Sequence, residues 1–379
     1  MRRTIFNDEH AAFREAAHGF LLREAVPHGD RWEEAGIIDR SFWKAAADQG
    51  LVGFSAPSEL GGADLDDFRF NAVLDEEVVA TGARTDAFSL TNDIVLPYFT
   101  ELTNAEQRER WLPGITTGDT VVAIAMSEPG TGSDLRAIAS TATWTGEHYE
   151  LSGSKTFITS GIQADLVVVA AKTVREGVSG LGLFVVPATA DGFSRGRKLD
   201  KIGRKAQDTA ELFFEGVVVP EADVLGEPGK GLGYMMRNLP QERLSMAVVA
   251  VAHAEKALRI TLDYARSRNA FGKPIGSFQA NRFTLAELTT ELQVARSHVD
   301  RCLEATTTGE LTAVEAAGVK FWTTELEFRV IDRCLQLHGG YGYMEEYEIA
   351  RMWRDSRVQQ IYGGTNEIMR EIVGRDLGI

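Results

Sequence analysis

The stretch that decides the fold is TVVAIAMSEPGTGSD, residues 120–134, where a run of apolar and β-branched residues gives way to a turn rich in Gly and Ser. The chain repeats this pattern from about residue 117 to residue 222. Short runs of Val, Ile, Thr and Phe bounded by Gly, Ser, Asp and Pro are typical of strands separated by turns. The runs are TVVAIAM, TATWT, HYELSG, KTFIT, DLVVVAA, GLFVVP and ELFFEGVVVP, and they predict a β domain of about seven strands.

Helical patterns flank this region on both sides. Phe13 and Phe20 recur at helical spacing near the start, and long amphipathic runs follow residue 230. Long antiparallel helices joined by short links favour a bundle. We therefore predict an α+β protein with an N-terminal helical domain (1–116), a central β domain (117–226) and a C-terminal four-helix bundle (227–379).

Composition narrows the function. The 379 residues carry 40 basic and 55 acidic side chains, a formal net charge of −15, which argues against a nucleic-acid binder. Two cysteines exclude a disulfide scaffold and a Cys-rich zinc module. No second His or Cys stands at metal-ligand spacing from His338, so no metal site is expected. The 37 glycines exceed the usual ~7% of residues, so their positions need an explanation.

No leader and no membrane span are expected. Residues 4–18 carry acids and histidines, and no window approaches the roughly 18 apolar residues that cross a bilayer. A cytoplasmic protein is the expectation that follows.

Two turns in the β region are candidate ligand contacts. SEPGTGSD (127–134) offers backbone N–H groups and hydroxyls that can converge on an anion, although it is neither a P-loop nor a GxGxxG fingerprint. In KTFITSG (155–161), Phe157 suits packing on a flat heteroaromatic ring and Thr159 suits a hydrogen bond to its edge. Taken alone, ordinary structural turns are the better interpretation of both segments.

Three C-terminal segments have the same two interpretations. RNAFGKPIGSFQ (268–279) is either a solvated connection or a phosphate contact, and the glycines of LQLHGGYGYMEEY (335–347) suit a helix stop. In QIYGGTNEIM (360–369), Thr365 is a plausible N-cap at a helix terminus that also suits an anion or a carbonyl oxygen.

PQERLSM (240–246) reads first as the start of a helix, because Pro240 and Glu242 both suit a first turn. The face through Glu242, however, continues with Met246, Val249 and His253. A carboxylate at the mouth of such a largely apolar face would have a raised pKa and could serve as a base.

The order and spacing of these segments resemble the acyl-CoA dehydrogenase family over essentially the whole chain. AMSEPGTGSD, KTFITSG, RNAFGKPIG, QLHGGYGY and IYGGTNEI follow the family's order. NDIVLPY (92–98), GRKLDKIGRKAQDTAELFF (196–214) and LPQERL (239–244) are most similar to the long-chain type. Apart from this resemblance, PYF (97–99) is expected to interrupt the helical pattern of the N-terminal region.

The resemblance implies FAD between the β domain and the bundle, in a site shared between the subunits of a homotetramer. Matching cofactor positions are Ile124, Met126, Ser127, Ser133, Phe157, Thr159, Arg268, Phe271, Gln279, Gln336, Leu337, His338, Gly339, Gly340, Thr365, Asn366 and Glu367, and those from Arg268 to Gly340 would reach the FAD of a neighbouring subunit. Positions that match neighbours of the acyl-CoA are Ser133, Arg243, Tyr362, Gly363 and Gly364.

One departure concerns the catalytic base. Many family members carry a glutamate directly after the tyrosine of IYxGT, where this chain has Gly363. Long-chain and isovaleryl-type members supply the base from the helix of LPQERL, and Glu242 matches that position. The resemblance implies that Glu242 removes the α-proton of the thioester, while the Gly363 N–H and a flavin ribityl hydroxyl hold its oxygen.

The reaction expected from the resemblance is hydride transfer to FAD, which gives a 2-enoyl-CoA in fatty acid β-oxidation and passes electrons to an electron-transfer flavoprotein. Two alternatives remain open: an acyl-CoA oxidase that uses oxygen, and a non-catalytic flavin- or acyl-CoA-binding subunit of a hetero-oligomer, which Gly363 would explain. The acyl group is equally open, since straight long chains, branched chains and sterol side chains are all compatible.

Overall fold

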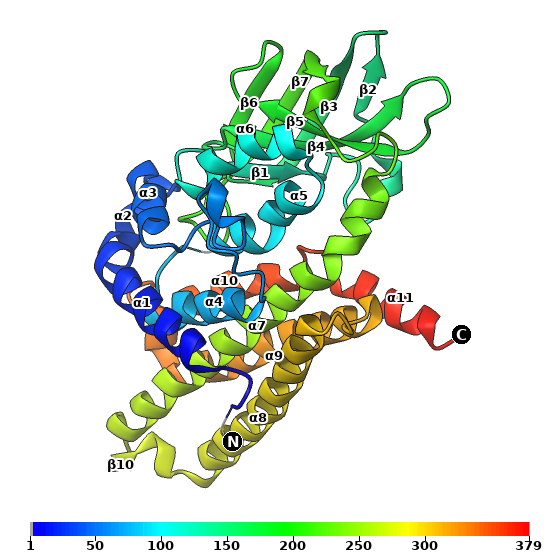
Figure 1. Ribbon diagram of the computed structural model, residues 1–379. Coiled ribbons are helices and arrows are strands. Elements are labelled where there is room, and N and C mark those ends of the chain that lie inside the picture. Colours follow the sequence, from blue (N-terminus) through cyan, green and yellow to red (C-terminus); the bar gives the residue numbers. More distant parts are fainter. Residues whose placement is uncertain (1–2, 86, 379) are drawn as a thin grey trace.

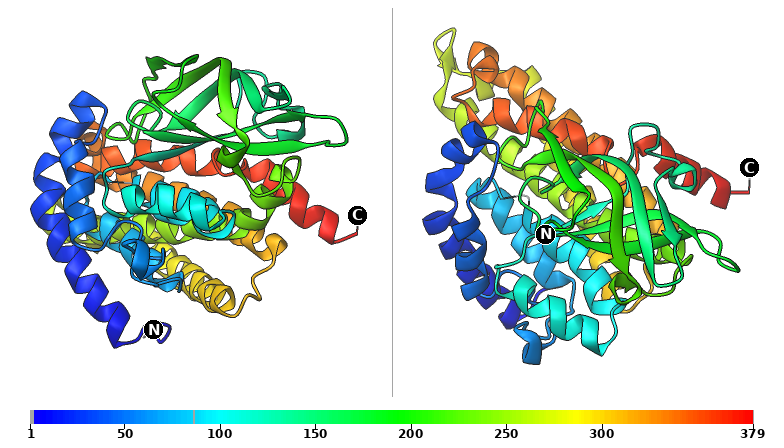
Figure 2. Two further views of the ribbon diagram at one scale, coloured as in Figure 1. Left: turned by 45° about the horizontal axis from the view of Figure 1, so that its top comes forward. Right: turned by 90° about the horizontal axis from the view of Figure 1, so that it is seen from above.

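The elements follow the predicted order of helices, sheet and helices in the computed structural model, which describes residues 3–85 and 87–378. Figure 1 places the sheet at one end of the molecule and the long C-terminal helices at the other. Figure 2 shows the sheet as one layer that covers the helices. The predicted α+β fold with N-terminal helices, a central sheet and C-terminal helices is confirmed.

Short helices make up the N-terminal part. They are α1 (Asp8–Glu24), α2 (Gly29–Ala35), α3 (Arg40–Asp48), α4 (Arg69–Thr81), α5 (Leu96–Glu101) and α6 (Ala105–Thr116). A π-helical segment at Ser89–Val95 leads directly into α5, so the prediction that PYF interrupts a helix is wrong. Pro97 lies in the first turn of α5, a position that suits proline because its φ is already helical.

The central sheet has eight strands, one more than predicted. They are β1 (Val122–Ala125), β2 (Thr141–Trp144), β3 (His148–Thr159), β4 (Leu166–Val174), β5 (Leu181–Pro187), β6 (Phe193–Lys198), β7 (Thr209–Pro220) and β8 (Val224–Leu225). Their order is β6-β7-β3-β2-β4-β5-β8, and β1 pairs with β4 in parallel. HYELSG and KTFIT are one strand, β3, which continues through Gly153. The strand β6 escaped prediction because this edge strand has no buried residue, and β8 because it has only two residues.

Helix α7 (Gly231–Ser267) is the longest element and the centre of the C-terminal part. It continues through Pro240, so the prediction of a helix start at that proline is wrong. Helices α4, α8 and α9 all pack against it. The remaining elements are β9 (Asn269–Ala270), β10 (Lys273–Pro274), α8 (Gln279–Thr307), α9 (Ala313–His338), α10 (Glu348–Ser356) and α11 (Asn366–Asp376).

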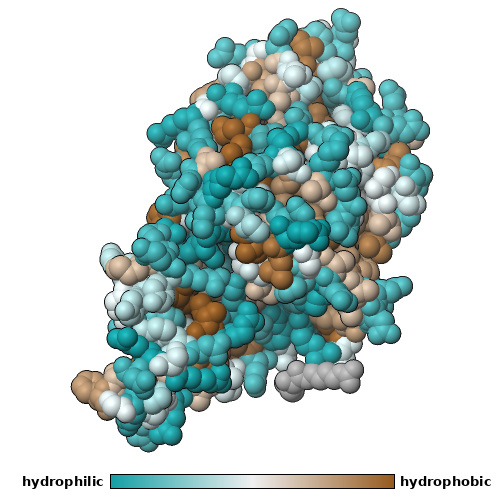
Figure 3. All heavy atoms as spheres, turned by 90° about the vertical axis from the view of Figure 1, so that its left-hand side faces the viewer, coloured by the Kyte–Doolittle hydropathy of each residue, from teal (hydrophilic) through white to brown (hydrophobic). Residues whose placement is uncertain are grey.

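Burial follows the apolar faces of these helices. Leu244, Val248 and Val251 of α7 share one buried cluster with Leu288 of α8 and Val330 of α9. The face of the molecule in Figure 3 is mostly hydrophilic, with small separate hydrophobic patches. Among residues 3–85 and 87–378, no helix combines the length and the apolar character needed to cross a membrane.

Candidate active site

Glu242 lies in the interior of α7, where its side chain is buried. The Tyr98 hydroxyl, on α5, donates a hydrogen bond to Glu242 Oε1 at 3.3 Å. Burial raises the pKa of Glu242 to about 7, against the lowering effects of that hydrogen bond and of the Arg243 charge. A carboxyl group with this pKa exchanges its proton near neutral pH, as a general base requires.

The segment that holds Gly363 lies against the same part of α7. A Cβ built on Gly363 would overlap the end of the Met246 side chain, which follows Glu242 by one helical turn. Gly363 has a φ of +62° and Gly364 one of +90°, both in the region that favours glycine. The fold thus brings together two positions that are 363 − 242 = 121 residues apart in the sequence.

Lys320 fixes this glycine segment from α9. Its Nζ donates to the Gly364 carbonyl at 2.8 Å and to Asn366 Oδ1 at 3.0 Å. Burial and the charge of Arg243 lower the pKa of Lys320 to about 8. Within the described ranges, no acceptor is bonded to the N–H groups of Gly363 and Gly364. Both are therefore available to a ligand oxygen.

Arg243 and Tyr362 are two further residues predicted to lie near the substrate. Arg243 is buried, and its Nε has no hydrogen-bond partner among residues 3–85 and 87–378. The Tyr362 hydroxyl donates to Gln359 Oε1 at 2.9 Å, and the Arg204 guanidinium lies over its ring, 5.7 Å from the centroid. A buried donor without an acceptor beside a carboxyl group is suited to a polar ligand atom.

A buried ion pair holds the turn at 127–134. Lys155 Nζ lies 2.8 Å from Glu128 Oε1 and also donates to the Met126 carbonyl at 3.1 Å. Glu128 accepts the N–H groups of Ala139 at 2.6 Å and Ser140 at 2.9 Å. Burial alone would raise the pKa of Glu128, but hydrogen bonds from Lys155 and Ser140 outweigh it and hold the pKa at about 2. The turn is fixed before any ligand arrives.

The glycines of this turn present open backbone. A Cβ on Gly130 or Gly132 would meet nothing within 4 Å, so packing within the chain does not require glycine at either position. Ser133 is exposed in the same turn, and Ile124, at the preceding β1, is partly exposed. An open glycine backbone permits close approach of a ligand.

Phe157 stands out on the neighbouring strand. Its φ is +60°, near the C-terminal end of β3, and 70% of the residue is exposed. The register between β3 and β7 shifts between Lys155 and Ile158, on either side of it. The Thr156 N–H donates to the Ser127 carbonyl at 3.0 Å, so this strand and the 127–134 turn are adjacent. A strained, exposed aromatic beside an open turn, with Thr159 two residues along, fits a planar heteroaromatic group.

A second group of predicted residues lies at the far end of α7. Arg268 directly follows α7, Phe271 lies between β9 and β10, and Gln279 begins α8. Phe271 is 96% exposed and has a φ of +51°. The Arg268 guanidinium lies over the Tyr341 ring, 5.5 Å from its centroid, so the loop after α9 is adjacent. That loop and the end of α9 carry Gln336, Leu337, His338, Gly339 and Gly340.

This second group does not reach Glu242 in the same chain. Arg268 follows Glu242 by 26 positions, along the rest of α7 to its C-cap. At 1.5 Å per residue, this separation corresponds to about 39 Å along the helix. Figure 1 shows the β9–β10 connection on the side of the molecule away from the sheet.

Several of the predicted residues also have structural roles. His338 is buried, its Nδ1 lies 3.0 Å from the Cys334 carbonyl, and its ring stacks on Tyr264 with centroids 4.3 Å apart. Thr365 caps α11 by accepting the Ile368 N–H at 3.4 Å, as predicted. Asn366 donates to the Phe321 carbonyl at 3.3 Å, so its side chain faces α9, while Glu367 is exposed.

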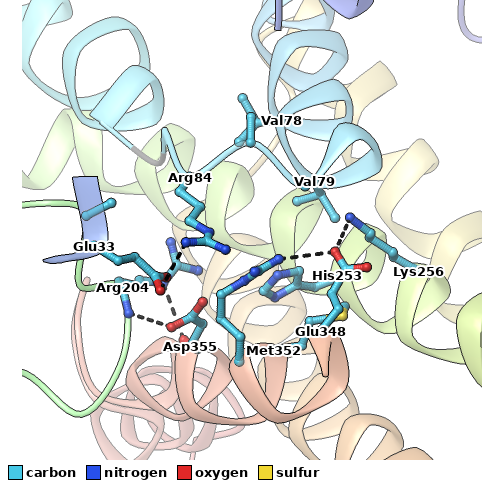
Figure 4. Close-up of a pocket in the computed structure, with 14 residues that line it drawn as sticks. Glu33, Val78, Val79, Arg84, Arg204, His253, Lys256, Glu348, Met352 and Asp355 are labelled. Carbon is cyan, nitrogen blue, oxygen red and sulfur yellow. Dashed lines mark hydrogen bonds and ion pairs between the residues drawn. The ribbon is translucent and has the colours of Figure 1, made fainter. Parts of the chain in front are cut away.

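A charged pocket lies further along the α7 face of Glu242 (Figure 4). His253 lines it eleven residues after Glu242, about 16 Å along the helix. Its charges are paired within the pocket: Lys256 with Glu348 at 2.6 Å, and Arg84 with Glu33 at 3.2 Å. Burial, together with the Arg204 charge, lowers the pKa of His253 well below its ordinary value, and its Nδ1 lies 2.9 Å from Glu327 Oε1. The apolar part of the face ends at this pocket.

Sequence reasoning missed three residues of the site. Tyr98 lay in a segment read as a helix break, although its neighbour Pro97 suits a helix start. Lys320 is buried in the amphipathic helix α9. From the sequence alone, a lysine in such a helix is expected on the solvent-exposed face, so its role was not predicted. Arg204 lies in a loop and reaches Tyr362 only through folding.

Comparisons with known proteins agree over the whole chain. Models of the N-terminal, middle and C-terminal domains of acyl-CoA dehydrogenase match residues 7–119, 123–217 and 229–378. Long-chain specific acyl-CoA dehydrogenase, mitochondrial, from Rattus norvegicus is 45% identical over 99% of this chain and 88% of its own length. An acyl-CoA dehydrogenase from Geobacillus kaustophilus has a TM-score of 0.95 and 45% identity over 99% of both chains. An acyl-CoA dehydrogenase from Bacillus anthracis, complexed with FAD, has a TM-score of 0.87 and 31% identity over 98% of this chain and 67% of that chain.

Proposed function

Because this chain belongs to the acyl-CoA dehydrogenase family, we propose that Glu242 is the catalytic base in its FAD-dependent oxidation of an acyl-CoA to a 2-enoyl-CoA. The observation that carries the proposal is the position of Glu242. It is a buried carboxyl group with a pKa of about 7, beside the glycine that stands where many relatives have their glutamate.

The protein's own groups account for proton removal. Glu242 takes the α-proton, and the Tyr98 hydroxyl holds its carboxylate in one orientation. The N–H groups of Gly363 and Gly364 bind the thioester oxygen, where charge develops as the proton leaves. Lys320 keeps those groups in place through the Gly364 carbonyl. Exclusion of water from this buried site strengthens each interaction.

In this proposal, the cofactor site lies at Phe157, Thr159 and the 127–134 turn. The open glycines of the turn and the exposed Phe157 ring support this position. When bound there, FAD supplies the hydride acceptor for the β-carbon. The buried Glu128–Lys155 pair keeps the turn in place for it.

The acyl tail lies along Met246 and Val249 toward His253. Val249 and Ala252 of α7 form a small apolar cluster with Val79 of α4, which supports an apolar path between these helices. The path ends at the ion pairs of the charged pocket, about 16 Å from Glu242. The name of the rat relative supports a long-chain substrate.

Assembly completes the site in this proposal. The residues from Arg268 to Gly340 serve the FAD of a neighbouring subunit in a homotetramer, because the helix length of about 39 Å keeps them from the Glu242 site of their own chain. An electron-transfer flavoprotein would be the partner that accepts the electrons from the assembled protein.

Anaerobic mixing with a panel of acyl-CoA thioesters of varied length and branching tests this function. Bleaching of the flavin by at least one thioester is expected in the wild-type protein. Glu242→Gln should retain FAD and lose bleaching by a factor of at least about 10³. Glu34→Gln, at an exposed position, is the matched control and should behave as wild type.

The outcomes separate the alternatives. Full bleaching in Glu242→Gln would overturn the base assignment. No bleaching of the wild-type flavin by any thioester would favour a non-catalytic binding subunit. Rapid peroxide formation in air, with no other acceptor present, would identify an oxidase.

A further inference from the structure

Two buried carboxyl groups meet behind the Glu242 turn. Asp75 of α4 and Asp93 of the π-helical segment are each 2% exposed, and Ser245 of α7 lies between them. The distance from Ser245 Oγ to Asp93 Oδ2 is 2.6 Å, and to Asp75 Oδ2 it is 3.1 Å. The outer oxygens are bonded as well: Asn71 Nδ2 donates to Asp93 Oδ1 at 2.6 Å, and the Ser89 hydroxyl donates to Asp75 Oδ1.

Counting protons shows that one of these acids is neutral. A serine hydroxyl has one hydrogen and can donate to only one carboxylate. If Ser245 donates over the shorter distance, to Asp93, its contact with Asp75 needs a proton on Asp75. If it donates to Asp75 instead, Asp93 must carry the proton. Either way, the three side chains form a continuous chain of hydrogen bonds only when one proton is shared.

The charges around the pair favour the same state. On α4, Glu76 and Glu77 are paired elsewhere, with Arg14 among their partners. On α7, Glu242 and Arg243 are the ionisable residues within three positions of Ser245, and on α5, Tyr98 follows Asp93 by five residues. Among residues 3–85 and 87–378, no Lys or Arg makes a salt bridge with either aspartate of the pair. Burial raises the pKa of Asp93 to about 6, and burial together with the Asp93 charge raises that of Asp75 further above its ordinary value.

The pair is connected directly to the catalytic turn. Ser245 follows Glu242 by three residues on α7. Gln241, the residue before Glu242, donates from Nε2 to the Asp93 carbonyl at 3.1 Å. Tyr98, which bonds Glu242, follows the π-helical segment after three residues. The π-helical segment therefore contacts both sides of the Glu242 turn, and π-helical insertions often occur at functional sites.

We propose that Asp75 and Asp93 share one proton through Ser245 and so position the Glu242 turn of α7 against the π-helical segment. The pair does not touch substrate; it acts through Glu242, and this role rests on the function proposed above. Loss of the shared proton places two like charges in contact in the core. The π-helical segment then separates from α7, and Glu242 loses its hydrogen bond from Tyr98.

The pH profile of turnover shows the positioning role. Glu242 must be deprotonated to act, so kcat rises with pH on the acid side. Loss of the shared proton causes a second, alkaline fall, of about tenfold per pH unit beyond its apparent pKa. Asp75→Asn and Asp93→Asn each keep a complete hydrogen-bond chain with one negative charge. Both variants should keep the acid limb and lose the alkaline fall. Asp263→Asn is the matched control, because Asp263 is exposed on α7, the helix that carries Ser245. This variant should keep both the acid limb and the alkaline fall.

An infrared measurement tests the shared proton without using activity. At pH 8, above the pKa of Glu242, the wild-type protein should show the carbonyl stretch of a protonated carboxyl group. Difference spectra against Asp75→Asn and Asp93→Asn should contain that band, and the difference against Glu242→Gln should not. Absence of the band from the first two would overturn the shared proton. Its presence together with an unchanged alkaline fall in both variants would overturn the positioning role. If Glu242→Gln stays active while the band behaves as expected, only the proposed base has failed.

Discussion

At the scale of the residue, the proposed reaction depends on the protonation state of Glu242. Burial raises its pKa to about 7, while the Tyr98 hydrogen bond lowers it. Tyr98→Phe removes the hydrogen bond that lowers the pKa of Glu242, so the pKa should rise further under the effect of burial. We expect the acid limb of the bleaching rate to move to higher pH in this variant, measured by stopped-flow mixing with a saturating thioester. An acid limb that stays in place or moves to lower pH would show that Tyr98 does not hold the base.

Gly363 is the second residue on which the proposed reaction depends. A Cβ there would overlap Met246 and would also need a φ of +62°, which costs a non-glycine residue about 1 kcal/mol. Gly363→Ala should therefore lower kcat/KM by about tenfold or more. Adding Met246→Ala creates room for the Cβ and should recover part of the loss, while Met246→Ala alone serves as the control. Equal losses in the single Gly363 variant and the double variant would show that the overlap is not the cause.

The resemblance predicted Glu242 as the base and Gly363 as a thioester contact, but the local sequence could not show how the fold places them relative to each other. Their resemblance to family motifs supplied the candidates, and only the packing of Met246 against Gly363 places them together. Tyr98 was beyond sequence reasoning for the same reason. Its partner lies 144 residues away, and no local pattern encodes that hydrogen bond.

At the scale of the element, the turn at 127–134 depends on one buried ion pair. Removing one partner of such a pair leaves a buried charge uncompensated, at a cost of about 3–5 kcal/mol. Glu128→Gln should therefore lower the midpoint of thermal unfolding and weaken FAD binding, measured by calorimetry and by flavin fluorescence. Glu128→Leu combined with Lys155→Met removes both charges and should recover much of the stability but not the FAD affinity, because the turn loses its anchor. Normal FAD affinity in both variants would contradict this role of the pair.

Elements with a strong pattern were predictable, and those without one were not. The helices after residue 279 follow from their periodicity, and the strands β2, β4 and β5 follow from short runs of apolar and β-branched residues bounded by turn formers. The strand β6 has no buried face and forms an edge, so it carries no such signal. The helix start predicted at Pro240 was wrong, because proline is more common at the start of a helix than inside one. The helix α7 instead continues through Pro240 over its full length.

At the scale of the whole molecule, the two groups of cofactor residues predict a complementation experiment. Glu242→Gln should be inactive, and Arg268→Ala should bind FAD poorly. In a mixed assembly, however, some sites combine Glu242 from one chain with Arg268 from another. Co-expressed variants should recover about a quarter of wild-type activity if subunits mix at random. Each variant expressed alone is the control, and no recovery in verified mixed oligomers would show that a single chain supplies both groups.

The domain order was predictable from the alternation of patterns along the chain, whereas the distance between the two groups was not. That distance depends on α7 remaining one helix from Gly231 to Ser267, which the sequence around Pro240 argued against.

The length of α7 has a thermodynamic consequence. If one helix delivers its two ends to different FAD molecules, cofactor binding and subunit association are linked equilibria. Excess FAD should then shift dissociated chains toward the oligomer, and dilution should release FAD at a concentration set by the association constant. The apparent affinity for the cofactor would be a property of the protein concentration as well as of the site.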